Sequence, residues 1–396
     1  MNQGILYISY DGMLEPLGQS QVLAYLEKLA PGRRIHLISY EKPEDWASAD
    51  KLDALRKRIA KAGIHWHPLR YHKRPTAPAT AYDVAAGTVR AISIVRRHKL
   101  RIVHARSYVA ALIALSVKRA TGFKLLFDMR GFWADERVDG GIWPQDSRLY
   151  RLTKSLERRF LLASDHIVTL TQASKAELGR FDYLQGRMPP VSVIPTCADL
   201  DRFDIQGPRQ CDPFVLGYIG SVGTWYLLDE MLKCFVALRA LKPDARLLIV
   251  NRDEQLHIRE RAAANGIDPS LIEIVAAEHR EMPRQIGRMS AAMALIKPVY
   301  SKIASAPTKL AEYLGCGVPC LGNVGIGDMA ETLEGKGVGI ALPGFGQDQI
   351  GLGMRRLLEL TEQPDIQDRC RSVAQQLFSL DGGVTTYSGI YDELSR

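Results

Sequence analysis

Short apolar runs alternate with longer amphipathic stretches through the first half of the chain. The amphipathic stretches have helical spacing and cover residues 21–29, 51–62, 82–98 and 108–120. The apolar runs are short enough for buried strands and cover residues 5–9, 35–39, 64–68, 102–105, 125–128, 166–170 and 191–194. Strands that alternate with helices predict a parallel sheet with right-handed crossovers, so functional side chains are expected just after each strand.

The same pattern begins again in the second half, with the segment VLGYIGSVGTWYLLDEML and the later apolar runs LLIV and AMALI. At 396 residues the chain is too long for one typical core. We therefore expect an α/β protein with two domains, residues 1–205 and 206–375, followed by a terminal helix at residues 376–396. The linker is expected at residues 205–213, which are polar and contain proline and glycine.

Composition and spacing exclude several classes of protein. No stretch approaches the roughly 18 uninterrupted apolar residues of a membrane-spanning helix. The start of the chain lacks the basic segment and long apolar run of a signal peptide, so a cytoplasmic location is expected. The six cysteines lack both CxxC spacing and a matching histidine pair, which predicts reduced, mostly buried thiols and no metal. The glycine loop after the first strand, from Gly12 to Gly18, is not GxGxxG, so a nicotinamide dehydrogenase is disfavoured.

Positive charge is concentrated in the first half. Residues 1–200 hold 31 lysines and arginines against 19 acidic residues, whereas residues 201–396 hold 21 against 25. Much of the excess lies in residues 51–74, where basic side chains alternate with Trp66, Tyr71 and three histidines. This segment could lie on an anionic membrane surface or meet an acidic acceptor, and a solvated helix with a linker explains it about as well. No nucleic-acid partner is expected.

Residues 305–323, SAPTKLAEYLGCGVPCLGN, carry the most specific signal. A turn leads into a short helix, and two glycines end that helix before an apolar strand at residues 318–321. Hydroxyls and a lysine at a helix N-terminus suit a phosphate, and a glutamate suits the two hydroxyls of a ribose. A plain capped helix is the alternative for this segment taken alone. The residues concerned are Ser305, Pro307, Thr308, Lys309 and Glu312.

The pattern P-x-K-x-x-E-Y-L-x-x-G-x-P in this segment resembles the donor-binding helix of the family 4 glycosyltransferases. That family has the GT-B fold, with two Rossmann-like domains facing across a cleft, and its members mostly retain the anomeric configuration. The resemblance implies that Glu312 holds the ribose of a nucleotide sugar. Many members carry another glutamate eight residues earlier, where this chain has Ala304. The contact to the transferred sugar is therefore left open between Ser305 and Lys302.

The resemblance extends along the whole chain. It implies that the loop ending at Gly18 lies beside the donor phosphates and the acceptor. Residues 274–289 are expected to line the nucleobase pocket. The terminal helix, residues 376–396, is expected to cross back to the first domain.

The donor diphosphate needs positive charge, and the sequence offers it in an unusual place. The turn formed by Gly220, Ser221, Gly223 and Thr224 follows a predicted strand and can bring backbone amides close to a diphosphate. Family members commonly carry an arginine and a lysine nearby, and this chain lacks that pair. Other basic residues could supply this charge. Each of them alone could equally be a surface charge, but all of them follow strands of one sheet or begin a helix. They are Arg252, Lys297, Lys302 and Lys309.

Polar segments after the fourth and fifth strands indicate the acceptor side. By resemblance, Asp128 and Arg130 lie close to the reacting centre, and with Lys302 they are the predicted catalytic residues. A structural ion pair would also explain Asp128 and Arg130. The charges and tryptophans that follow them predict a loop over a polar pocket. The further acceptor-side candidates are His104, Arg106, Trp133, Asp135 and Glu136.

Together these features predict a hexosyltransferase that moves a hexose from a UDP- or GDP-sugar to a hydroxyl of a glycan or lipid-linked glycan precursor, with retention. No metal or other cofactor is expected, because basic side chains and helix termini can stabilise the departing diphosphate. Two alternatives remain: a GT-B nucleotide-sugar epimerase, and a non-catalytic partner subunit that binds a nucleotide or a membrane. The expected location is the cytoplasm, with peripheral contact to the inner face of the membrane.

Overall fold

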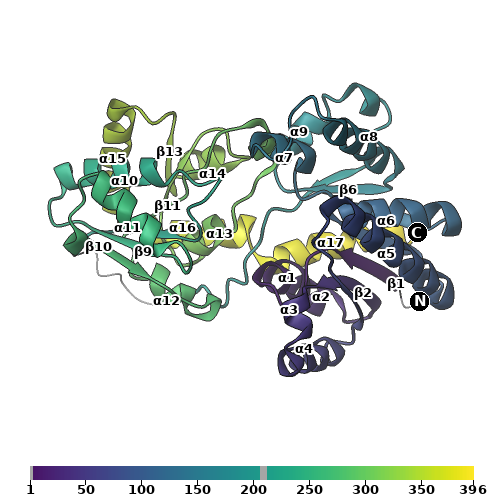
Figure 1. Ribbon diagram of the computed structural model, residues 1–396. Coiled ribbons are helices and arrows are strands. Elements are labelled where there is room, and N and C mark those ends of the chain that lie inside the picture. Colours follow the sequence, from purple (N-terminus) through teal and green to yellow (C-terminus); the bar gives the residue numbers. More distant parts are fainter. Residues whose placement is uncertain (1–2, 206–211) are drawn as a thin grey trace. The chain divides into compact units, whose positions relative to one another are not determined.

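The computed structural model describes residues 3–205 and 212–396, and the chain forms two compact units (Figure 1). Unit 1 consists of Met1–Pro195 together with Leu380–Arg396, and unit 2 consists of Thr196–Ser379. The sequence placed the corresponding boundaries after residues 205 and 375. Residues 206–211 of the predicted linker lie outside the described part of the chain.

Unit 1 is built on a seven-stranded parallel sheet with the order β3-β2-β1-β4-β5-β6-β7. Every predicted strand of this half is present, with ends within two residues of the expected ones. All five residues of the central strand β4 are buried, as in parallel sheets covered on both faces. The strands are β1 (Gln3–Ser9), β2 (Arg33–Glu41), β3 (His65–Arg70), β4 (Ile102–Arg106), β5 (Lys124–Asp128), β6 (His166–Thr169) and β7 (Val191–Val193).

Helices cover both faces of this sheet (Figure 1). Crossovers from β1 to β3 lead toward one edge, and crossovers from β3 onward lead toward the other. Because parallel crossovers are right-handed, the two sets lie on opposite faces. One face carries α1 (Pro16–Gly18), the π-helical turn η1 (Gln19–Leu23), α2 (Ala24–Leu29), α3 (Pro43–Trp46) and α4 (Ala49–Lys61). The other carries α5 (Thr76–His98), α6 (Ser107–Thr121) and α8 (Arg148–Ala163), while α7 (Trp133–Asp139), α9 (Gln172–Leu178) and η2 (Asp182–Leu184) complete the connections.

The last helix of the chain, α17 (Leu380–Leu394), belongs to unit 1 and packs against α2. Tyr25 of α2 meets Tyr387 edge to face, with ring centroids 5.7 Å apart. Lys28 of α2 pairs with Asp381 at 2.6 Å. The terminal segment therefore returns to the first unit, as the family resemblance implied.

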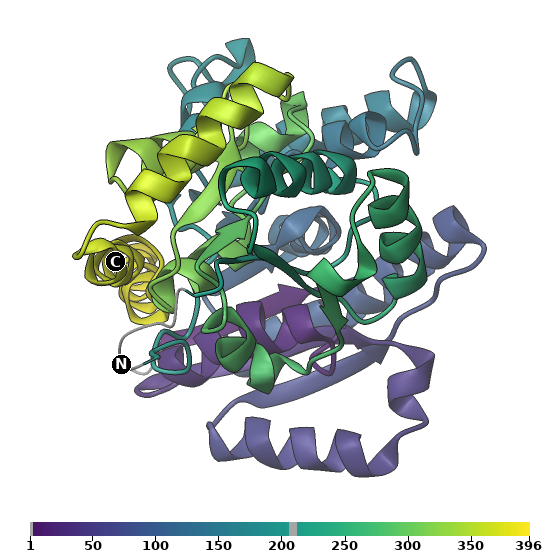
Figure 2. The ribbon, with the colours of Figure 1, turned by 90° about the vertical axis from the view of Figure 1, so that its left-hand side faces the viewer.

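Unit 2 is built on a six-stranded parallel sheet with the order β10-β9-β8-β11-β12-β13. Its strands are β8 (Val215–Ile219), β9 (Arg246–Val250), β10 (Ile272–Val275), β11 (Ala291–Met293), β12 (Cys320–Asn323) and β13 (Gly339–Leu342). Its α-helices are α10 (Leu228–Leu241), α11 (Gln255–Ala264), α12 (Met282–Ile286), α13 (Thr308–Gly315), α14 (Met329–Gly335), α15 (Gln347–Thr361) and α16 (Ile366–Leu377). The short 3-10 turns are η3 (Pro269–Leu271), η4 (His279–Glu281) and η5 (Tyr300–Ala304). In Figure 2 the yellow-green α15 lies beside the teal α10, with which it is in contact.

Two local predictions were wrong. The segment after β5, expected to be a loop, forms α7 instead, with Asp135 and Glu136 in its first turn, where negative charge favours a helix. The strand expected at residues 318–321 begins two residues later, at Cys320. Val318 belongs to the end of the preceding helix, because Gly317 has φ +70 and the N–H of Val318 donates to the carbonyl of Tyr313. Pro319 has no N–H to donate to a neighbouring strand.

Within the described residues, no helix is long and apolar enough to cross a membrane. The five described cysteines are buried. The sixth, Cys211, lies outside the described residues.

Four histidines meet where β2, β3 and α5 come together. The ring of His36 lies 4.3 Å from that of His98, 4.6 Å from that of His65 and 5.3 Å from that of His67, between centroids. Arg34 and Arg90 add positive charge beside them, through contacts to the carbonyl of His98 and the ring of His67. Burial, helped by the neighbouring histidines and arginines, lowers the pKa of His36 to about 3 and that of His67 to about 4.

We predict that this cluster makes unit 1 acid-sensitive. His36 binds a proton below about pH 6.5 in the unfolded chain but only near pH 3 in the folded one. Stability is therefore lost as the pH falls from 6.5 toward 3, by about 3 kcal/mol at pH 4 for this group alone. Urea unfolding at pH 7, 5 and 4 measures the loss. His36→Gln should reduce the loss between pH 7 and pH 4, and His257→Gln, at an exposed histidine, should leave it unchanged. An equal loss in His36→Gln and the unaltered protein would contradict the prediction.

Candidate functional site

In each unit the polar residues gather where the strand order reverses. The reversal falls between β1 and β4 in unit 1 and between β8 and β11 in unit 2. In open parallel sheets, ligands bind at the carboxyl ends of the strands beside such a point. Each unit therefore contributes one group of candidate residues, and the two groups are described separately.

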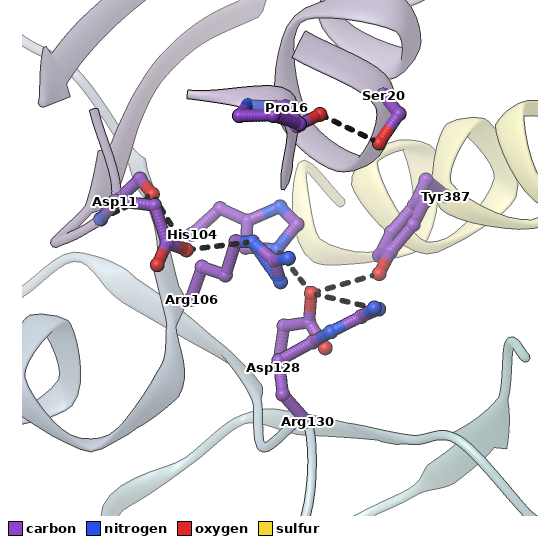
Figure 3. A network of polar contacts seen from close by, with 9 residues as sticks. Asp11, Pro16, Ser20, His104, Arg106, Asp128, Arg130 and Tyr387 are labelled. Atoms are coloured by element: carbon purple, nitrogen blue, oxygen red, sulfur yellow. Dashed lines mark hydrogen bonds and ion pairs between the residues drawn. The ribbon is translucent and has the colours of Figure 1, made fainter. Parts of the chain in front are cut away.

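In unit 1, the carboxylate of Asp128 at the end of β5 is the centre of a buried network (Figure 3). Its Oδ2 accepts a hydrogen bond from the hydroxyl of Tyr387 at 3.0 Å. The same oxygen lies 3.7 Å from Nε2 of His104 and 3.9 Å from a terminal nitrogen of Arg130. On the other side of the ring, Nδ1 of His104 lies within hydrogen-bond distance, 2.7 Å, of the hydroxyl oxygen of Tyr391. The network thus joins β4, β5 and α17.

The charges in this network follow from burial and its neighbours. Burial acts to raise the pKa of Asp128, but Arg130, with His104 and Arg106, outweighs it and holds the pKa below its ordinary value. Burial lowers the pKa of His104 despite the nearby Asp128. At neutral pH the site therefore holds an anionic aspartate, a neutral histidine and a cationic Arg130.

Two atoms of this network lack a hydrogen-bond partner among the described residues. They are Oδ1 of Asp128 and Nε2 of His104, and both are buried. Buried polar atoms in native structures nearly always have a partner, and exceptions often mark functional sites. Nε2 of His104 makes only the 3.7 Å ion-pair contact to Asp128, so both atoms keep hydrogen-bonding capacity that the described residues do not use.

The backbone beside these residues is strained. Ser107, directly after β4, has φ +68, and Arg130, two residues after β5, has φ +60. Non-glycine residues in this left-handed region cost energy and cluster at functional sites. The strain lies in the two turns that carry Arg106 and Asp128.

The loop after β1 is held by a buried carboxylate that the sequence analysis did not single out. Glu41, at the end of β2, accepts the backbone N–H of Met13 at 2.9 Å and the hydroxyl of Ser39 at 2.6 Å. A Cβ on Gly18 would lie 1.9 Å from the carbonyl oxygen of Gly12, so only glycine fits where the loop closes on itself. Close packing therefore accounts for Gly18. At the start of the same loop, the carboxylate of Asp11 lies 3.6 Å from Nε of the buried Arg106 (Figure 3).

The remaining acceptor-side candidates lie on or beside α7. Asp135 is buried and bound by Lys154 at 2.9 Å and by the hydroxyl of Tyr150 at 2.8 Å, so it serves a structural pair in this unit. Trp133 packs edge to face on Trp143, with centroids 5.2 Å apart. Glu136 lies in the same first turn and is partly exposed.

In unit 2, two lysines reach the turn that follows β8. The ammonium group of Lys302, from η5, lies 3.7 Å from the ring centroid of Trp225. That of Lys309, in the first turn of α13, lies 3.6 Å from the ring of Tyr226 and 2.9 Å from the hydroxyl of Tyr218. Both lysines are buried. Aromatic faces thus place two cations beside one glycine-rich turn.

The turn itself is tightly supported. Gly220 has φ +114, and a Cβ there would lie 3.2 Å from Nζ of Lys309. Asn251 donates to the carbonyl of Gly220 at 3.0 Å, and Glu254 accepts the N–H of Val222 at 2.9 Å. Thr224 has φ +28, while Ser221 and Gly223 are exposed. Of the predicted donor residues, Gly220 has both a conformational and a steric reason to be glycine.

Lys309 and Glu312 have opposite pKa shifts with one cause. Burial lowers the pKa of Lys309 to about 7, opposed by Glu312. Burial raises the pKa of Glu312 to about 7, opposed by Lys309 and Arg202. Among the described residues, nothing donates a hydrogen bond to the carboxylate of Glu312. Its acceptor capacity is therefore available.

The other predicted donor residues differ in position. Ser305, Pro307 and Thr308 are half-buried at the start of α13, where Pro307 occupies the N-cap and no side chain caps the helix. Arg252 and Lys297 are exposed, and Arg252 contacts the carbonyl of Ala277 at 3.4 Å. Lys302 and Lys309 place their ammonium groups on aromatic rings of the turn after β8, and the backbone N–H of Lys297 donates to the carbonyl of Trp225 in the same turn at 2.8 Å. In the described part of the chain, no cluster of three or more histidine, cysteine or acidic side chains is arranged to hold a metal.

Comparison with known proteins agrees with this architecture. Residues 18–202 match the sequence model of Glycosyltransferase Family 4. The chain carries a family 4 glycosyltransferase domain. No curated protein matches the sequence.

Solved structures that resemble this glycosyltransferase cover nearly its whole length. A sucrose-phosphate synthase from Thermosynechococcus elongatus has a TM-score of 0.73 at 14% identity, with 99% of each chain covered. A glycosyltransferase from Rickettsia africae has a TM-score of 0.70 at 15% identity, covering 100% of this chain and 99% of its own. HepE from Anabaena, solved with UDP and glucose, has a TM-score of 0.67 at 14% identity, covering 99% and 100%. The two parallel-sheet units thus form a GT-B fold, and the predicted fold class and family are confirmed.

Several site residues of the glycosyltransferase were missed from the sequence. Tyr387 and Tyr391 are four residues apart on α17, a spacing that places both on one face of a helix. Asp11 lies just after β1, where the strand-end rule would have included it. Trp225 and Tyr226 stand in the glycine-rich turn, but no sequence pattern pairs them with lysines some 80 positions away.

We predict that Asp128→Asn destabilises unit 1 more than Tyr387→Phe does. The asparagine leaves the largely buried Arg130 without its counter-charge, which should cost about 3 kcal/mol. Tyr387→Phe removes one hydrogen bond, which should cost about 1 kcal/mol. Urea unfolding at neutral pH measures both. Asp146→Asn, at an exposed aspartate, is the matched control with no expected change. The reverse order of the two losses would rule out the charge-balance account.

Proposed function

We propose that the glycosyltransferase moves a hexose from a UDP- or GDP-sugar to a hydroxyl of a glycan or lipid-linked glycan precursor, with retention of configuration. The observation that carries this proposal is the position of Lys302 and Lys309 on aromatic rings of the turn after β8, with the buried Glu312 three residues beyond Lys309 on α13. It supplies cations for a diphosphate and a carboxylate for a ribose within one unit.

The two lysines take over the role of the absent arginine and lysine pair. Lys302 lies on Trp225 and Lys309 on Tyr226, so both cations reach the turn whose backbone amides suit a diphosphate. HepE, which has the same fold, was solved with UDP and with UDP-glucose. A nucleoside diphosphate is therefore the expected ligand of this turn, and the lysines would stabilise its charge as it departs without a metal.

Glu312 suits the ribose because its carboxylate is buried and has no donor of its own in the described chain. A carboxylate can accept hydrogen bonds from two adjacent hydroxyls. Ala304, which stands where many relatives have a second glutamate, is buried and cannot bind a sugar hydroxyl through its side chain. We assign the contact to the transferred sugar to its neighbours Lys302 and Ser305.

The acceptor side lies in unit 1, at Asp128, His104 and Arg130. Oδ1 of Asp128 and Nε2 of His104 are the unpartnered buried atoms, and they can orient the acceptor hydroxyl. In the proposed reaction the bond between the anomeric carbon and the diphosphate breaks, and a bond to the acceptor oxygen forms on the same face. The acceptor proton passes to an oxygen of the departing diphosphate, so no protein nucleophile is required.

A lipid-linked acceptor would bring the enzyme to the inner face of the membrane. Residues 51–74 supply a basic surface that attracts anionic headgroups from a distance, since Lys51, Arg56, Lys57 and Lys61 are all exposed on or at the start of α4. An acidic glycan acceptor would meet the same charge.

We predict that one nucleoside diphosphate raises the melting temperature and that Glu312→Gln removes the effect. A ligand at about 100 times its dissociation constant adds about 2.7 kcal/mol to the folded state. Thermal unfolding against UDP, GDP, ADP, CDP and TDP and their common sugars measures it. Glu362→Gln, on the exposed surface of unit 2, should respond like the unaltered protein. If none of the nucleotides shifts the transition, the donor site is not on α13 and the partner-subunit alternative gains. Turnover of the donor sugar to its epimer without acceptor would favour the epimerase instead.

We also predict that nucleotide binding at pH 8 takes up a proton. Without ligand, Lys309 is mostly neutral at this pH because its pKa is about 7, and a diphosphate beside it favours the charged form. Isothermal titration in two buffers of different ionisation enthalpy should give an uptake approaching one proton per nucleotide. The terminal phosphate of the nucleotide, with a pKa of about 6, is already ionised at pH 8 and contributes no proton uptake.

Two variants separate Lys309 from other sources of the proton. Lys309→Met should bind weakly and take up much less than the unaltered enzyme. Lys336→Met, at an exposed lysine of the same unit, should take up the same amount as the unaltered enzyme. Binding at pH 8 without any uptake would show that Lys309 does not meet the diphosphate.

A further inference from the structure

The outer surface of α8 combines arginines with leucines and contains no acidic residue. The only acid of this helix, Glu157, points inward and pairs with Lys154. Leu149, Leu152 and Leu162 are 44%, 57% and 38% exposed. In the described part of the chain, none of the helix's exposed arginines pairs with a carboxylate, although Arg158 lies over the ring of Tyr183. Those arginines are Arg148, Arg151, Arg158 and Arg159.

This surface differs from the basic segment at residues 51–74. On α4 the large apolar residues Leu52, Leu55 and Ile59 are all buried, so its outer surface offers charge alone. No large apolar side chain is exposed anywhere between residues 46 and 81. One of its arginines, Arg58, is also occupied by Glu27 at 2.6 Å. The α4 surface can attract anionic lipid from a distance but has nothing to insert.

The two helices cannot serve one flat membrane together. They lie on opposite faces of the first sheet, α4 beside the edge strand β3 and α8 beside β5 (Figure 1). A helix that lies in a bilayer interface needs basic residues at its polar border and apolar residues that enter the acyl boundary. Only α8 has both.

We propose that α8 is the surface through which this protein contacts an anionic lipid bilayer, with Leu149, Leu152 and Leu162 entering the headgroup region and the arginines binding lipid phosphates. The inference rests on the proposed function only in that a lipid-linked acceptor gives the contact a purpose. The helix is preformed for this role. Phe160 and Leu161 anchor it in the core, and Lys154 bridges Glu157 to Asp135 of α7.

Vesicle co-sedimentation of the full-length protein tests the assignment, with phosphatidylcholine vesicles that contain or lack phosphatidylglycerol. The α8 variant Arg148→Gln, Arg151→Gln, Arg159→Gln should lower binding to the anionic vesicles on the order of 100-fold, about fivefold per charge. The matched variant Arg56→Gln, Lys57→Gln, Lys61→Gln removes the same charge from α4 and should lower binding by no more than about threefold, as expected of a distant, screened contribution.

A leucine pair separates insertion from simple charge attraction. Leu149→Ser with Leu152→Ser should lower binding about tenfold even though the charge is unchanged. Leu256→Ser with Leu352→Ser, at exposed leucines of unit 2, should have no effect. Circular dichroism of each variant confirms that it is folded.

The outcomes decide the proposal without reference to the transferase reaction. Loss of binding in the α4 variant with retention in the α8 variant would overturn it, as would equal binding to neutral vesicles or no binding by the unaltered protein. Nucleotide-induced thermal shifts measured on the same variants are expected to be unchanged. A protein that binds vesicles through α8 but shows no nucleotide shift would sustain this inference while the donor assignment fails.

Discussion

A buried charge must be balanced where it lies, and this requirement organises unit 1. The carboxylate of Asp128 is surrounded by apolar strands, so it persists only because Arg130, His104 and Tyr387 converge on it. Satisfying it fixes the left-handed turn at Arg130, the orientation of the histidine and the docking of α17. One carboxylate thus couples three segments that are far apart in the sequence. The polar atoms left over from that balance are the ones that the proposed function assigns to the acceptor hydroxyl.

Unit 2 faces a different problem, which is how to hold two buried cations beside one turn. Lys302 and Lys309 lie on aromatic faces, which attract positive charge but are too weak to replace full hydration. The lowered pKa of Lys309 measures the remaining cost. Under the proposed function, a ligand that carries two phosphates relieves this cost on binding. The same burial that lowers the pKa of Lys309 would then strengthen its attraction to the diphosphate.

Much of this architecture is readable in the sequence, for identifiable reasons. Buried parallel strands require continuous apolar runs, so β1 to β7 could be placed within two residues. The strand-end rule located Asp128, His104 and the turn at Gly220, because topology alone brings strand ends together. The rule could not distinguish a ligand contact from a structural ion pair, because Asp128 and Asp135 look alike in the sequence. They differ in their partners: Asp135 pairs with a lysine of α8, and Asp128 lies beside an arginine of the turn that follows it.

Contacts between distant segments were beyond the sequence patterns. The contacts of the two lysines with aromatic rings depend on how the segment that carries them packs against the turn after β8. No local spacing in the sequence predicts this packing. The failure at residues 318–319 has a simpler cause, because the helix stop and Pro319 together delayed the strand. The contrast between α4 and α8 is similar, because both are basic helices and only the burial of their side chains shows that α8 keeps leucines exposed.

The membership of α17 in unit 1 has a consequence for synthesis on the ribosome. The hydrogen bond from Tyr387 to Asp128 joins residues 259 positions apart, and all of unit 2 is made between them. Unit 2 can complete its sheet as soon as it emerges, whereas unit 1 must wait with its central aspartate only partly balanced until the last residues of the chain appear. The N-terminal half is thus translated first but finished last, which reverses the usual order for chains that fold domain by domain. During that interval the unfinished unit exposes the surface that α17 later covers, so a nascent chain stalled before residue 380 would carry a complete second unit and an incomplete first one.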